Sequence, residues 1–310
     1  MSSSNYLDLG DCDRICEYSK VQFWYAERLK ATAFRSALKY NRCCKGGRVK
    51  LPLPREPPKP IKDLLKNSHF MENIRAYNQM FSMTSFGAKI DDSVNDGYGP
   101  YVFKVVGQIS HWMGSLCPPE DQNPRFLQMY IYDTQNKVDN KLSHFRQNED
   151  NTLKAEIVEL LIQVFDQYNE LVKIFRTARD MCMNKSTPQF NIRLYNNGNR
   201  QCYDAPASGT LGAIVYDSGP KTKNDFDIIV HFKDTVPQRI NKLHPLYMAL
   251  QFPLLFIFGE HGWSPELKFT NDNHRGDKNL TMNMFYSYQL HDRLNMKALL
   301  LQGGGYFNNI

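Results

Sequence analysis

The 310-residue sequence lacks the short motifs on which most nucleotide-dependent and hydrolytic enzymes depend. It contains no Gly-Lys dipeptide, which excludes a P-loop within these residues, because that loop needs its lysine and backbone amides to hold phosphates. It has no His-Glu-x-x-His helix, no Gly-x-Ser-x-Gly turn and no deaminase signature. Nor do two histidines flank a single hydrophobic residue, the arrangement that holds a divalent metal in some nucleases. We therefore expect no ATPase or metal-dependent nuclease activity from these residues.

Long apolar runs are also absent. The longest candidate, residues 248–258, is interrupted by Gln251 and Pro253, so we expect no membrane span and no membrane partner. The N-terminus is polar and acidic, unlike a secretory signal. Seven cysteines, an odd number, favour a reducing compartment, cytosolic or nuclear. The values of 42% hydrophobic and 13% aromatic residues are those of a globular protein.

Acidic residues are missing from one stretch, residues 28–55. Since the whole chain carries +6, that stretch holds +9 and the remainder −3 (6 − 9). A single-sign patch favours phosphate contacts with nucleic acid, although a solvated basic face without a partner has the same composition. The basic residues are Arg28, Lys30, Arg35, Lys39, Arg42, Lys45, Arg48, Lys50 and Arg55.

Hydrophobic periodicity predicts a mixed α+β fold. The predicted helices are residues 21–40, 61–81, 152–181, a helix from 244 that continues into a buried strand, and a helix from 282. The predicted strands are a short edge strand at 49–51 and residues 101–110, 126–133, 190–195, 212–216 and 226–233. Five prolines in residues 52–60 predict an extended linker.

The cysteines offer the best chemical lead. Cys12, Cys16, Cys43 and Cys44 cluster in sequence before the proline-rich linker, and pairs of soft ligands are what tetrahedral zinc prefers. The first pair would read Cys16-Glu17-Tyr18-Ser19, with serine in place of a second thiol. Cys12 could supply the missing thiolate, and adjacent cysteines reach one metal only with backbone strain. The alternative is a set of reduced, partly buried thiols without metal.

Two further polar pairs are weaker candidates. Asp225 and Asp227 share one face of a predicted strand, a spacing compatible with a metal pair but common without one. His291 and Asp292 could be a base and its orienting acid, although neighbours on a helix point apart, which favours a capping or surface role.

Several long phrases resemble the N-terminal region of plant Helitron transposon proteins over nearly the whole chain. These phrases are CDRICEYSKVQFWYAERL, YNRCCKGGRVKLPLPREPP, HFMENIRAYNQMFSMTSFGAKID, GPYVFKVVGQISHWMGSLCPPE, FLQMYIYDT, APASGTLGAIV, KLHPLYMALQFPLLFIFGEHGWSP and MNMFYSYQLHDRL followed by LLLQGGGYF. The resemblance implies a basic, zinc-ribbon-like module at 1–51, a linker at 52–60, a mixed α+β domain at 61–280, and the truncated start of a Helitron helicase-like domain at 281–310.

The resemblance also implies function. The family's nuclease and helicase would lie beyond these residues, so we expect a non-catalytic fragment that binds DNA, single-stranded DNA in particular, in the nucleus, with no small-molecule substrate. The family's zinc pattern maps onto Cys16, position 19, Cys43 and Cys44, and Ser19 departs from it. Trp24 and Tyr25 could stack on bases, although we expect Trp24 in the core. The alternatives are a helicase or nuclease, as in the parent family, and a protein-interaction or structural domain.

Overall fold

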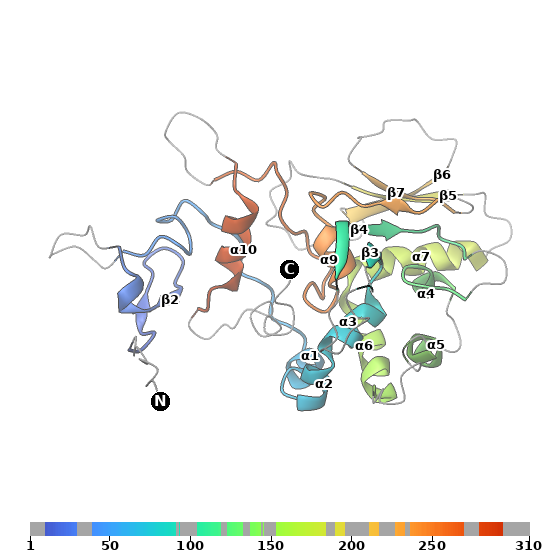
Figure 1. Ribbon diagram of the computed structural model, residues 1–310, viewed down its shortest axis with the longest axis horizontal. Helices are drawn as coiled ribbons and strands as arrows, with labels where there is room; N and C mark the ends of the chain where they lie inside the picture. Colours follow the sequence, from blue (N-terminus) through green and yellow to red (C-terminus); the bar gives the residue numbers. More distant parts are fainter. Residues whose placement is uncertain are drawn as a thin grey trace. The chain divides into compact units, whose positions relative to one another are not determined.

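The computed structural model describes residues 10–29, 39–90, 93, 104–118, 123–132, 137–143, 145, 153–183, 190–195, 211–216, 227–232, 236–269 and 279–293 (Figure 1). These residues form two compact units. Unit 1 comprises the described residues up to 57 and from 263 onward, and unit 2 those from 58 to 262. Both helices and sheets are present, which confirms the α+β class. No helix in the described part is both long and apolar enough to cross a membrane.

Unit 2 contains two small antiparallel sheets. One has the order β3-β4-β8, formed by β3 (Ser85–Ile90), β4 (Val105–Met113) and β8 (Gln238–Arg239). The other has the order β6-β5-β7, with β5 (Phe190–Leu194) between β6 (Gly212–Tyr216) and β7 (Ile228–Val230). Phe190, Ile192 and Leu194 alternate with half-exposed residues along β5, so one face of this sheet is buried, as period-2 patterning requires.

Unit 2 also contains several helices. They are α1 (Lys59–Leu64), α2 (Ser68–Glu72), α3 (Ile74–Phe81), α4 (Gln128–Ile131), α5 (Lys137–Ser143), α6 (Ala155–Tyr168), α7 (Glu170–Met183) and α9 (Tyr247–Gln251). Helix α7 packs against β6 on one side and α4 on the other (Figure 1). Helices α6 and α7 are separated at Asn169, whose extended backbone ends α6 and whose Oδ1 accepts hydrogen bonds from two first-turn amides of α7.

Unit 1 has little regular structure. It contains a two-strand ladder of β1 (Arg14–Ile15) and β2 (Gln22–Phe23), a 3₁₀ turn η1 (Tyr25–Glu27) and helix α10 (Met282–Leu290). Thr281 caps α10 by accepting a hydrogen bond from the Met284 amide. The core of the unit joins residues far apart in sequence, because Phe285 and Tyr288 of α10 are buried in one cluster with the N-terminal segment.

Several sequence-based boundaries were wrong. The predicted helix 21–40 begins as strand β2, and the 3₁₀ turn η1 follows; its residues 30–38 lie outside the described part. The predicted helix 61–81 is three short helices, the predicted helix 152–181 is broken at Asn169, and 126–133 contains helix α4 instead of a strand. No strand forms at 49–51 or at 252–258. Strand β4 overlaps the predicted strand 101–110 and ends three residues beyond it, and the predictions of β5, β6, β7 and α10 are confirmed.

The two units divide the chain near the predicted linker. The division at residues 57 and 58 falls within residues 52–60. The described residues from 263 onward belong to unit 1 together with the N-terminal segment. The strand-poor N-terminal segment therefore gains its hydrophobic core from residues more than two hundred positions away.

Candidate metal centre and basic loop

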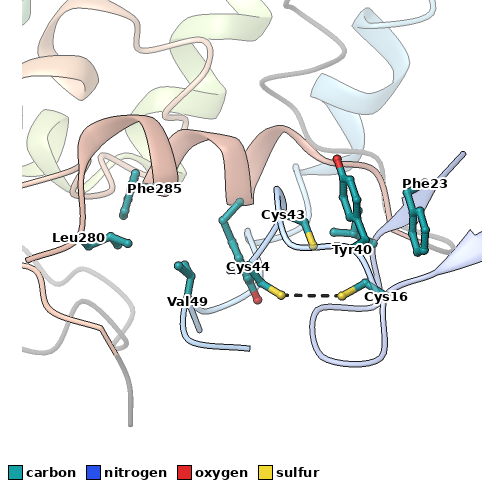
Figure 2. Close-up of a cluster of buried hydrophobic side chains, with 10 residues drawn as sticks. Cys16, Phe23, Tyr40, Cys43, Cys44, Val49, Leu280 and Phe285 are labelled. Carbon is teal, nitrogen blue, oxygen red and sulfur yellow. Dashed lines mark hydrogen bonds between the residues drawn. The ribbon is translucent and has the colours of Figure 1, made fainter. Parts of the chain in front are cut away.

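Three buried thiols meet inside unit 1. The sulfur atoms of Cys16, Cys43 and Cys44 all lie within 4.8 Å of one another, and the side chains are at most 2% exposed. The Cys16 and Cys44 sulfurs are 3.8 Å apart, the contact that Figure 2 marks with a dashed line. We call these three residues the thiol cluster. Among the described residues it is the one group of three or more metal-ligating side chains close enough to hold a metal ion.

The loop of residues 41–48, here called the doublet loop, turns both adjacent cysteines inward. The Lys45 amide donates to the Asn41 carbonyl at 2.8 Å, closing one turn around the doublet. Lys45, Gly46 and Gly47 then take positive φ values of 52°, 68° and 87°, which reverse the chain. The Gly47 amide donates to the Cys44 sulfur at 3.2 Å. The backbone strain expected for adjacent ligands therefore falls on Lys45, because a positive φ is unfavourable for lysine but not for Gly46 and Gly47.

The Cys16 side of the cluster is a second tight turn. The Lys20 amide donates to the Cys16 carbonyl, and the Cys16 amide donates to the Val21 carbonyl. Lys20 takes a φ of 59°, so the chain reverses directly after Ser19. This turn brings the Ser19 hydroxyl to 3.2 Å from the Cys43 sulfur, to which it donates a hydrogen bond. The four positions of the expected pattern, Cys16, Ser19, Cys43 and Cys44, thus converge.

Cys12 does not join the thiol cluster. It is half-buried, and its carbonyl accepts a hydrogen bond from the Gln22 side chain. Burial raises the pKa of its thiol, and the nearby Glu27 and Asp292 carboxylates raise it further, so the thiol stays protonated. Of the four cysteines considered, the structure brings together three.

The thiols of the cluster stabilise one negative charge between them. Hydrogen bonds from Cys43 and Cys44 lower the pKa of the Cys16 thiol, outweighing burial, which raises it. The contact with Cys16 raises the pKa of Cys43, as do the contact with Cys44 and burial. One thiolate is therefore favoured, whereas further thiolates at this depth need a cation beside them. A metal ion fits this donor set, and the group could hold one.

Helix α10 and the residue that follows it support the cluster. Tyr40, next to the doublet loop, stacks on Phe23 at 4.7 Å between ring centroids (Figure 2). Its hydroxyl group hydrogen-bonds to His291 at 2.9 Å. The guanidinium of Arg293 is buried and donates to three backbone carbonyls, those of Ser19, Tyr288 and His291. Arg293, which follows α10 in the chain, therefore holds the Ser19 carbonyl in place.

The predicted DNA-binding residues lie at the surface of this unit where they are described. Lys39, Arg42, Lys45, Arg48 and Lys50 are exposed, and three of them extend from the doublet loop. Arg28 is half-buried, with its guanidinium 3.8 Å from the centre of the Tyr25 ring. The Leu29 amide donates to the Lys39 carbonyl, which places the end of that segment beside the doublet loop. Lys30 and Arg35 lie outside the described residues.

The expectation that Trp24 is a core residue was wrong. Trp24 is 39% exposed and Tyr25 is 48% exposed. Trp24 has an extended backbone, and its amide donates to the Glu27 carboxylate at 3.1 Å, so the chain bends there and turns the indole away from Phe23, which is buried in its place. Arg14 lies on Tyr25 as well, 5.6 Å from the ring centre, so two guanidinium groups accompany this exposed ring.

The two weaker candidates have structural roles. Asp227 is buried and pairs with Arg193 across β5 and β7, and Asp225 lies outside the described residues. His291 caps the C-terminal end of α10 through a hydrogen bond between its Nδ1 and the Ser287 carbonyl. This agrees with the capping role expected from its position.

Neither a protein-family model nor any curated protein sequence matches this chain significantly.

Proposed function

We propose that unit 1 is a metal-stabilised module that binds single-stranded DNA, and that the chain is a non-catalytic part of a Helitron-type transposon protein acting in the nucleus. The observation that carries the proposal is the doublet loop. It exposes Arg42, Lys45 and Arg48 to solvent while its two thiols are buried. A cation within the cluster would fix the loop conformation that presents these side chains.

Phosphate contacts supply the affinity in this proposal. Each lysine or arginine set against a phosphate releases condensed counterions, so binding weakens steeply with salt and depends little on base sequence. The exposed aromatic rings of Trp24 and Tyr25 supply stacking surfaces of the kind that single-stranded nucleic acid uses. Their exposure favours single strands over a duplex, whose bases are already stacked.

Zinc is the ion that we propose for the thiol cluster. Thiolates that surround zinc tetrahedrally at about 2.3 Å have sulfur atoms about 3.8 Å apart. The distance of 3.8 Å between the Cys16 and Cys44 sulfurs matches that spacing. The role would be structural: a bound zinc ion contributes folding free energy to a unit with little regular secondary structure.

The test is binding of a fluorescent single-stranded oligonucleotide to the full chain, followed by anisotropy. The variant K39Q/R42Q/K45Q removes three exposed charges beside the thiol cluster. Its matched control, K59Q/K66Q/K154Q, removes three exposed charges from unit 2. We expect the first variant to weaken binding at least about tenfold and the control to weaken it little. Equal losses would show that net charge alone attracts DNA, and unchanged binding in both would leave the basic loop without this role.

A further inference from the structure

A hydroxyl group lies beside the thiol cluster at the position of the fourth ligand in the expected pattern. Ser19 is only 7% exposed, and its Oγ donates to the Cys43 sulfur at 3.2 Å. It follows Cys16 by three positions, the spacing at which a second thiol of a zinc-binding pair stands. Its side chain is therefore directed at the sulfurs, and no fourth thiol lies among them in the part of the chain that the structure describes.

The backbone keeps Ser19 in this place. Its carbonyl accepts a hydrogen bond from the buried Arg293 guanidinium at 3.2 Å. The turn closes between Cys16 and Lys20, and the positive φ of Lys20 follows immediately. These contacts hold the Ser19 backbone so that its hydroxyl group lies at the thiol cluster and not at the protein surface.

A serine hydroxyl is a poor ligand for zinc at neutral pH, because it binds strongly only after losing a proton that it holds far more tightly than a thiol does. As a hydrogen-bond donor, by contrast, it suits a thiolate well. A donor at Cys43 also withdraws electron density from that sulfur and lowers the charge that it offers to an ion. Three sulfurs with such a donor are a complete ligand set for an ion that needs three ligands, but they are one protein ligand short of the four that structural zinc sites use.

We infer that the thiol cluster is a three-thiolate site in which Ser19 is a hydrogen-bond donor and not a ligand. It therefore holds zinc less tightly than a four-thiolate site and releases it more readily to thiophilic ions satisfied by three sulfurs, such as trivalent arsenic. This inference rests on the metal binding proposed above. With arsenous acid the step is an exchange without redox change. Three As–OH bonds are replaced by three As–S bonds to Cys16, Cys43 and Cys44. The three hydroxides leave as water with the protons of the two protonated thiols and one proton taken from solvent, because one sulfur of the cluster is already a thiolate.

The test compares the full chain with S19A, S19C and a control, S68C, which adds a thiol to exposed α2 in unit 2. Each protein is loaded with Co²⁺ or Cd²⁺, and the sulfur-to-metal charge-transfer absorption counts the bound thiolates. Zinc affinity and the arsenite concentration that displaces zinc are measured on the same samples. We expect three thiolates in the native chain, in S19A and in S68C, and four in S19C.

We further expect S19C to bind zinc at least about tenfold more tightly and to require correspondingly more arsenite for release, with S68C unchanged. A changed Co²⁺ spectrum in S19A would make Ser19 a ligand and overturn the inference, as would equal zinc affinity in the native chain and S19C. Absence of any bound ion would overturn it as well. DNA binding is read separately by anisotropy, so a chain that loads metal but does not bind DNA refutes the proposed function alone.

Discussion

Replacement of the buried Arg293 should destabilise unit 1 more than any surface substitution. Its side chain is 6% exposed and donates to the carbonyls of Ser19, His291 and Tyr288 at 3.2, 3.2 and 2.7 Å. Hydrogen bonds from a charged donor are worth roughly 1.5–3 kcal/mol each. Removing a buried cation also recovers part of its desolvation cost, so we expect a net loss of about 2–4 kcal/mol in the free energy of unfolding for R293M.

The assay is amide hydrogen exchange followed by mass spectrometry on peptides from residues 13–29 and 279–293. A loss of that size accelerates exchange of the amides that open with the unit about 30- to 700-fold. R293K keeps the charge but not the planar set of donors, so its effect should be smaller than that of R293M. The control is R179M, since Arg179 pairs with exposed Asp180 on α7 and such pairs contribute about 0–1 kcal/mol. Exchange in R293M within threefold of the native rate would refute the reasoning.

Three other substitutions test single features. Gly46 and Gly47 both have positive φ, but a Cβ at Gly46 meets open space whereas one at Gly47 lies 2.6 Å from the Tyr18 ring. In urea denaturation, G46A should lower the free energy of unfolding by about 1 kcal/mol and G47A by at least about 1 kcal/mol more. Equal losses in the two variants would contradict the contact with Tyr18. Burial lowers the pKa of His244 to about 4. At His244 the unfolded chain therefore binds more protons than the folded one between pH 4 and about 6.5, so this residue alone should make stability rise with pH in that window by up to about 1.4 kcal/mol per unit. Burial also lowers the pKa of His111 and His261 to about 4. H244N should therefore reduce the slope without abolishing it, and an unchanged slope would contradict the contribution of His244. N169A, which removes the cap of α7, should cost about 1–3 kcal/mol in urea denaturation, because two amides of the first turn lose their acceptor. A loss below about 0.5 kcal/mol would contradict the capping role.

Strands and helices with a clear period were predictable from the sequence. Along β5, Phe190, Ile192 and Leu194 alternate with Asn191 and Arg193, and local pattern and burial agree. Residues 126–133 form a largely apolar run that favours a strand, yet Phe126 takes a φ of 51° and the Arg125 amide donates to the Gln128 side chain, so a helix starts there. Its packing against α7 is a tertiary contact that local periodicity does not contain.

The thiol cluster was predictable in part. Residue type and spacing selected Cys16, Cys43 and Cys44, because soft ligands in pairs are a specific signal. They did not decide whether Cys12 is a ligand, because the position of its side chain depends on the path of the backbone through residues 10–16. The burial of Ser19 depends on Arg293, which is 274 positions away in sequence, so no local signal predicts it.

The exposure of Trp24 could not be read from its residue type. A tryptophan at helical spacing from other apolar residues is usually part of a core. Here the helix does not start at residue 21, because residues 22–23 pair with residues 14–15 and the turn η1 follows. Once the element type changed, the face on which each side chain lies changed with it.

The salt dependence of single-stranded DNA binding tests the central claim most directly. The five exposed basic residues Lys39, Arg42, Lys45, Arg48 and Lys50 predict a slope of log K against log salt concentration of about −3.5 if each contacts one phosphate. In K39Q/R42Q/K45Q the slope should fall in magnitude by about 2. A native slope near zero, or the same slope in native chain and variant, would contradict the account.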